Sequence, residues 1–160
     1  MVATPIGASA RYIPEGVTKY NWLPACANYL SPTRAEINAG TDLSPEIAST
    51  GNWGIISGTI DTPDLATLFT AQIGGKVTVD GPTLDMYADG TSTDVRTLLP
   101  RGTTGFILKL PEGDIAGRKM DVFPVKVLQQ AKPTNLTNPS VVQLAFACTK
   151  IPAENVTVPA

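Results

Sequence analysis

Short apolar runs at β-strand spacing, separated by glycine- and proline-rich turns, constrain the fold of this chain more than any other feature. The runs cover residues 17–29, 46–56, 76–80, 83–88, 103–110, 119–131 and 140–150. Within one of them, Leu84, Met86 and Ala88 alternate with Thr83, Asp85 and Tyr87, as in a strand buried on one face. The sequence therefore predicts a mainly β protein, an antiparallel β-sandwich or barrel-like fold.

Turn residues stand between several of these runs, namely Gly74-Gly75, Asp80-Gly81-Pro82, Asp89-Gly90, Glu112-Gly113-Asp114 and Thr137-Asn138-Pro139. Each supplies a positive φ or a proline-fixed φ, which tight connections between antiparallel strands require. The runs at 122–128 and 141–148 are apolar on both faces apart from Lys126 and Gln143, which predicts strands covered on two sides. Pro124 predicts an edge or a bulge within the first of these strands.

One short flanking α-helix is predicted over residues 93–99. Ser92 or Thr93 can cap it, Asp94 lies near its positive end, and Pro100 ends it. Residues 61–73 fit two interpretations, because Asp61-Thr62-Pro63-Asp64 begins like a helix whereas residues 67–73 fit a strand equally well. Both alternatives stay open.

Irregular segments flank and interrupt the strands. Residues 1–16 and 152–160 have no sustained period and are expected to form extended N- and C-terminal arms. Residues 30–53 form a long polar loop with room for one helical turn. The chain has 160 residues and no internal repeat, so we expect a single domain over residues 1–160.

The residue types present exclude most catalytic chemistry. The chain has no histidine, which removes Ser-His-Asp and Cys-His catalysis and imidazole metal ligands. Asp61 and Asp64 are better explained as turn or cap residues than as paired catalytic carboxylates. Asp85, Asp89 and Asp94 lack the spacing of a calcium loop. We expect no enzyme, no metal and no cofactor.

Cys26 and Cys148 lie far apart, and either one disulfide or two free thiols fits them. Their apolar surroundings favour buried, inert thiols. The N-terminus lacks the pattern of a signal peptide, and no apolar stretch approaches the roughly 18 residues of a membrane span. We therefore expect a soluble protein made in a cytoplasm, with no membrane partner.

Charge is unevenly distributed along the chain, whose formal net charge is −2. Residues 1–95 hold four basic and ten acidic groups, whereas residues 96–160 hold eight basic and four acidic groups. Two arrangements are consistent with this asymmetry. Loops of both halves can interleave on one surface, or opposite faces can carry opposite signs, which favours head-to-tail stacking of identical subunits.

Several stretches, taken in order, resemble one protein family along nearly the whole chain. They are Pro32-Thr-Arg-Ala-Glu-Ile-Asn-Ala-Gly-Thr-Asp-Leu43 with Trp53, Leu84-Asp-Met-Tyr-Ala-Asp89, and residues 94–106, 120–127 and 152–159. In their order and spacing these stretches resemble the major tail (tail tube) proteins of long-tailed, non-contractile bacteriophages. None of them is a catalytic signature.

This resemblance implies a structural virion protein whose copies assemble into hexameric rings that stack into a hollow tail tube. The tube would be the conduit for DNA ejection, with the tape-measure, tail-tip and tail-terminator proteins as partners, and would be assembled in the host bacterial cytoplasm. DNA would pass without specific binding, because each Lys or Arg contact to phosphate would add affinity and drag.

On that basis we expect contacts between rings in the 32–53 segment and contacts to neighbours in both arms. The expected inter-ring residues are Arg34, Glu36, Asn38, Asp42 and Trp53. Asp85 and Asp121 are the expected lumen-facing residues. Two alternatives remain, a carbohydrate-binding or adhesion β-sandwich and another minor phage tail or head-tail structural protein. The dispersed tryptophans argue against the first of these.

Overall fold

The computed structural model describes residues 3–160, so the first two residues of the expected N-terminal arm lie outside the described residues. The strands are β1 (Lys19–Leu23), β2 (Thr41–Asp42), β3 (Ile47–Thr50), β4 (Ile55–Thr62), β5 (Ala71–Val79), β6 (Thr83–Tyr87), β7 (Thr104–Leu110), β8 (Lys119–Ala131), β9 (Val141–Cys148) and β10 (Ala153–Thr157). Two α-helices, α1 (Arg34–Asn38) and α2 (Val95–Leu98), and one 3-10 turn, η1 (Ser44–Glu46), complete the fold.

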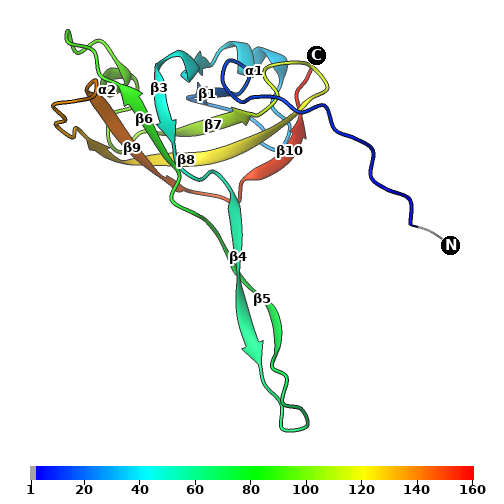
Figure 1. Ribbon diagram of the computed structural model, residues 1–160. Helices are drawn as coiled ribbons and strands as arrows, with labels where there is room; N and C mark the ends of the chain where they lie inside the picture. Colours follow the sequence, from blue (N-terminus) through cyan, green and yellow to red (C-terminus); the bar gives the residue numbers. More distant parts are fainter. Residues whose placement is uncertain (1–2) are drawn as a thin grey trace.

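Every strand pairing in the described residues is antiparallel, which confirms the predicted mainly β, sandwich-like class. The main sheet has the order β2-β1-β7-β8-β9-β6-β3, and β10 pairs with β8. It curves strongly but is not a closed barrel (Figure 1). The strands β4 and β5 pair only with each other and form a separate hairpin that leads away from the sheet (Figure 1).

The main core lies on one face of the main sheet. Trp22 of β1, Ile107 of β7 and Phe123 of β8 pack there in one cluster with Leu84 of β6 and Leu144 of β9. All five side chains are buried. The period-2 alternation of these strands directs their apolar residues into this one layer.

A second core lies on the other face of β1, β7 and β8, where α1 and the C-terminal residues cover the sheet. It joins Leu23, Ile37, Leu108 and Val158. The C-terminal segment therefore differs from the extended arm that the sequence predicts. Its residues form β10, which pairs with β8, because burial of Val158 and the added strand pairing hold it against the sheet.

The two strands predicted to be covered on both sides behave differently. In β8 the prediction for 122–128 holds for residues 122–125, where Val122 and Phe123 are fully buried on opposite faces, but not at Leu128, which is 48% exposed. In β9 only one face is buried, and Gln143 is exposed, because no element covers the outer side of that strand. The two-sided prediction for 141–148 is therefore wrong.

Pro124 lies in the middle of β8, neither at an edge nor at the bulge, which falls between Val127 and Gln129. Its carbonyl accepts a hydrogen bond from the Thr149 N–H at 2.9 Å, just beyond the end of β9. On the same side β10 begins only at Ala153, opposite Val122. The proline, which has no N–H to donate, therefore occupies the gap between two partner strands.

The predicted helix at 93–99 is confirmed as α2, although its cap differs from the prediction. Asp94 is the N-cap, and its side chain accepts the Arg96 N–H. The helical turn expected within the long loop is α1, where Thr33 and Glu36 form a reciprocal capping box.

Residues 61–73, for which the sequence left a helix and a strand open, belong to the β4–β5 hairpin. Strand β4 ends at Thr62 and strand β5 begins at Ala71. A turn at Gly74-Gly75 is therefore a wrong prediction. The pair lies inside β5, beside a bulge between Ser57 and Thr59. A Cβ on Gly75 would lie 3.2 Å from the Gly58 carbonyl oxygen, so the close approach of the strands at the bulge favours glycine there.

Both cysteines are free and half-buried, which settles the choice between a bridge and two thiols. Their burial is less complete than the sequence predicts. Desolvation raises the pKa of the Cys148 thiol to about 11, so this thiol stays protonated at neutral pH. None of the helices in residues 3–160 has the length and apolar character that crossing a bilayer demands.

Candidate assembly surfaces

The β4–β5 hairpin exposes apolar side chains along its whole length. Ile56, Ile60, Ile73 and Val77 are each between 43% and 55% exposed. Both outer edges of the hairpin are unpaired in the described part of the chain. An isolated two-stranded hairpin is at best marginally stable in water, and exposed apolar strands with free edges mark sites of association. The hairpin therefore has the character of a segment that another chain covers.

The connection at the end of the hairpin, residues 63–70, presents three more apolar side chains. Leu65 and Leu68 are fully exposed and Phe69 is 78% exposed. Asp64 holds this turn by accepting the N–H groups of Ala66 and Thr67 at 2.8 and 2.9 Å. We call residues 63–70 the hairpin tip.

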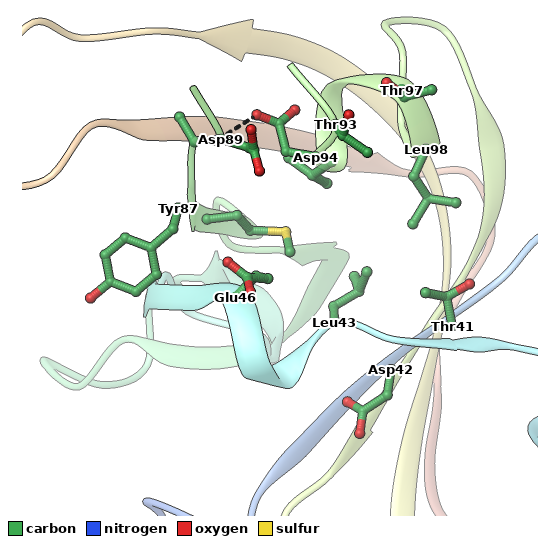
Figure 2. Close-up of a pocket in the computed structure, with 13 residues that line it drawn as sticks. Thr41, Asp42, Leu43, Glu46, Tyr87, Asp89, Thr93, Asp94, Thr97 and Leu98 are labelled. Atoms are coloured by element: carbon green, nitrogen blue, oxygen red, sulfur yellow. Dashed lines mark hydrogen bonds between the residues drawn. The ribbon is translucent and has the colours of Figure 1, made fainter. Parts of the chain in front are cut away.

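A groove of about 600 Å³ opens at the other end of the β3–β6 pair. Residues from 41–46 and 86–98 line it, and we call it the α2 groove. The buried side chains of Leu43, Met86 and Val95 form its base, and Tyr87 and Leu98 are partly exposed beside them. Figure 2 shows Leu43, Tyr87 and Leu98, from three separate segments, around the same hollow.

Carboxylates surround this apolar base, but several have partners within the chain. Asp94 pairs with the Arg96 guanidinium at 2.6 Å and accepts the Asp89 N–H at 2.9 Å, the bond drawn in Figure 2. Hydrogen bonds from Arg96 hold the pKa of Asp94 well below its usual range. Asp42 pairs with Lys19 at 3.2 Å. The carboxylates of Asp42 and Asp94 are thus engaged at the groove.

Arg34, an expected inter-ring residue, forms an internal latch. Its guanidinium donates to both carboxylate oxygens of Asp114 at 2.8 and 2.9 Å, and to the Pro159 carbonyl at 3.0 Å. These contacts tie α1 to the β7–β8 connection and to the C-terminus. The side chains of Arg34 and Asp114 are each 26% exposed.

Glu36 and Asn38 lie on the same helix, close to the latch. Glu36 accepts the N–H groups of Thr33 and Ala27 at 2.8 and 2.7 Å, which, with the Thr33 hydroxyl, lowers its pKa to about 2. The Asn38 side chain accepts a longer bond from Arg34 at 3.4 Å. The structure brings Arg34, Glu36 and Asn38 together on α1.

Asp42 and Trp53 lie apart from that cluster. Trp53 is buried, with its ring 5.1 Å from Phe123 and 5.5 Å from Phe146, and its Nε1–H donates to the Thr83 carbonyl at 3.0 Å. Its side chain therefore packs inside the subunit, and the residue as a whole is only 4% exposed, which argues against the expected inter-ring contact at Trp53.

Asp85 and Asp121 lie on opposite faces of the main sheet. Asp85 alternates with the core residues Leu84 and Met86, so it faces outward from β6, where the Ser49 hydroxyl donates to it at 2.8 Å. Asp121 shares the face of Phe123, two residues further along β8, and accepts the Asn155 N–H at 2.9 Å. At most one of these two aspartates can line a lumen formed by a single face.

Sequence reasoning missed the hairpin and its tip as a functional surface. The signal available was the combination of β-branched residues at 55–62 and 71–79 with the apolar residues Leu65, Leu68 and Phe69 around a capping aspartate. In residues 3–160, no group of three or more Cys, Asp or Glu side chains is placed to hold a metal ion.

Comparisons with known proteins identify the family. No curated protein matches the chain. Among solved structures, a chain of the anti-feeding prophage baseplate, determined with six-fold symmetry, is similar in fold with a TM-score of 0.55 at 7% sequence identity, covering 93% of this chain and 95% of that one. The model of the phage tail tube protein family matches residues 8–160. The chain thus belongs to the phage tail tube protein family and is a structural protein of a phage tail.

Proposed function

We propose that copies of this chain assemble into hexameric rings and that the rings stack head to tail into the hollow tube through which phage DNA is ejected. The observation that carries this proposal is the β4–β5 hairpin. The hairpin extends away from the body of the subunit (Figure 1), and its apolar side chains and both of its strand edges are exposed. In a single subunit in water, nothing buries these side chains or pairs these edges.

The position of the hairpin favours an open, repeating contact. It emerges from one end of the subunit (Figure 1), and in the proposed stacking a neighbour covers it with a different surface from the one that donates it. Such a heterologous contact closes into a ring or repeats along an axis. The sheet order places strands of residues 1–95 beside strands of residues 96–160, so the charge asymmetry along the chain does not by itself support this order.

Six subunits per ring is the number that the tail tube family resemblance implies. It agrees with the six-fold symmetry named for the baseplate structure of similar fold. The tape-measure, tail-tip and tail-terminator proteins complete the proposed set of partners, with assembly in the host cytoplasm.

The uncovered outer face of β6 and β9 is our proposed lumen surface. It carries Asp85 paired in register with Gln143, and Thr83 paired with Ala145. Small, polar and acidic side chains of this kind offer no phosphate-binding site, so DNA could slide past them. We propose Asp85, and not Asp121, as the lumen-facing carboxylate, because Asp121 is on the core side of β8.

Additional inter-ring contacts are proposed for the 32–53 segment, through the α1 cluster of Arg34, Glu36 and Asn38 and through Asp42, but not through the buried Trp53. The N-terminal arm is proposed to contact a neighbouring subunit. Residues 3–13 have no helix or strand, and Ile6 is 98% exposed. An extended apolar arm of this kind can add to a neighbour's surface at little structural cost.

Negative-stain electron microscopy of the purified, concentrated full chain, with and without tail-tip complex as a seed, tests the proposal. Hollow filaments with regular cross-striations are expected. A chain that stays monomeric at high concentration and after seeding contradicts it.

A further inference from the structure

We infer that the α2 groove is the receptor for the hairpin tip of a second copy of this chain. This inference rests on the proposed function and adds to it the surface on which one subunit receives the next. The donor is the tip with Leu65, Leu68 and Phe69, and the acceptor is the apolar base formed by Leu43, Met86 and Val95.

The two surfaces lie at opposite ends of the same strand pair. Ile47 and Met86 are paired beside the groove, and Thr50 and Leu84 are paired toward the hairpin. Beyond Thr50 the chain continues into β4 and away from α2, whose residues line the groove (Figure 1). Eight residues of β4 at about 3.3 Å each extend the tip about 26 Å from its root. A tip that points away from its own groove can reach only the groove of another molecule.

Donor and acceptor also match in chemistry. The tip presents three exposed apolar side chains in eight residues, and the groove is an open cavity of about 600 Å³ whose base is apolar. Tyr87 and Leu98, 42% and 38% exposed, supply further apolar area on its sides. Burial of apolar surface from both partners supplies the driving force for such a contact.

Two of the four carboxylates that line the groove form ion pairs within their own chain, and the one on the tip has hydrogen-bond partners there; Glu46 and Asp89 are the other two groove carboxylates. Asp64 of the tip is bonded to the N–H groups of its own turn, and Asp42 and Asp94 of the groove are paired with Lys19 and Arg96. With these partners, the three carboxylates stay in a polar rim around the contact. The apolar side chains of the tip and of the groove base meet inside that rim.

A cross-linking experiment between two full-length variants tests the pairing directly. Both variants carry Cys26→Ser and Cys148→Ser, so that no native thiol reacts. One adds Leu68→Cys in the tip, and the other adds Leu98→Cys in the groove and an affinity tag. After mixing under assembly conditions, a short bifunctional maleimide is added and tagged dimers are counted on a denaturing gel. The matched control replaces Leu98→Cys by Leu30→Cys, at a leucine that is 59% exposed and outside the groove.

A tip-to-groove dimer that is lost in the Leu30→Cys control supports the inference. If Leu98→Cys fails to fold, Thr97→Cys on the same helix takes its place in the groove. Tubes visible by electron microscopy with equal cross-linking to the control, or none, overturn the groove assignment and leave the tube proposal standing. No tubes and no cross-link refute both.

Discussion

Replacing Leu68 by serine should weaken assembly and leave the subunit fold intact. Leu68 is fully exposed in the single chain, so Leu68→Ser removes no native packing, and the free energy of unfolding should change by less than about 0.5 kcal/mol. In the proposed tube the same side chain would be buried in a neighbour, and burial of a leucine is worth about 1.5–3 kcal/mol. Since 1.4 kcal/mol is a factor of ten, the critical concentration for assembly should rise roughly ten- to hundredfold.

The assay is ultracentrifugal pelleting of polymer across a dilution series, with urea unfolding of each subunit alongside. Leu136→Ser is the matched control, because Leu136 is 99% exposed in the β8–β9 connection and outside the proposed contact. It should assemble like the wild type. An unchanged critical concentration for Leu68→Ser, or an equal rise for Leu136→Ser, would refute the assignment of the tip as the specific contact.

Four further predictions concern the fold, its pH dependence and the lumen. Trp53→Ala should lower the free energy of unfolding by about 3–5 kcal/mol in urea titrations, because the ring lies in the main core; a smaller loss than about 1 kcal/mol contradicts that placement. The pKa of Glu36 is lowered from 4.5 to about 2, so the ionised Glu36 stabilises the folded state fully above pH 4.5, and this contribution is lost as the pH falls toward 2. The free energy of unfolding of Glu36→Gln, measured by acid unfolding, should therefore depend less steeply on pH over that interval. Arg34→Glu should stop polymerisation and lower the urea midpoint, and Asp114→Arg in the same chain should recover the midpoint; normal tubes from Arg34→Glu contradict its assembly role. A bulky maleimide should label Asp85→Cys in free subunits but not from outside intact tubes, and outside labelling rules out the lumen placement.

The local pattern of apolar residues was sufficient to predict the strands whose apolar faces are buried in a core. The alternation of Leu84 and Met86 predicts β6, and the apolar run around Val122 and Phe123 predicts the two-sided burial of β8. The same rule failed for β9, because a run of apolar and small residues does not reveal whether another element covers its second face. Gln143 lies there in solvent.

Contacts between distant segments could not be predicted from the chain alone. Arg34 and Asp114 are separated by 80 residues, and no local signal joins them. Trp53 was expected at a subunit contact because tryptophan is frequent at binding sites, yet it fills the main core beside Phe123. The residues next to a tryptophan in the sequence do not show whether it lies in the core or at a subunit contact, because tertiary packing decides its position.

The hairpin resisted prediction for a different reason. Its β-branched residues, such as Ile60 and Ile73, are exposed in the single chain, so they do not follow the burial pattern that identifies strands of a self-contained domain. When the apolar residues of a segment are covered by another molecule, the sequence of one chain does not show which of them become buried. The proposed contact between subunits would therefore explain why the hairpin was not predicted.

Cryo-electron microscopy of the assembled full chain, with symmetry determined from end-on views, tests whether the subunits form a tube through their hairpins. We expect a hollow tube of stacked six-fold rings, with the β4–β5 hairpin of each subunit covered by a neighbouring subunit. A closed assembly that does not stack, or a tube in which the hairpin remains exposed to solvent, would contradict it.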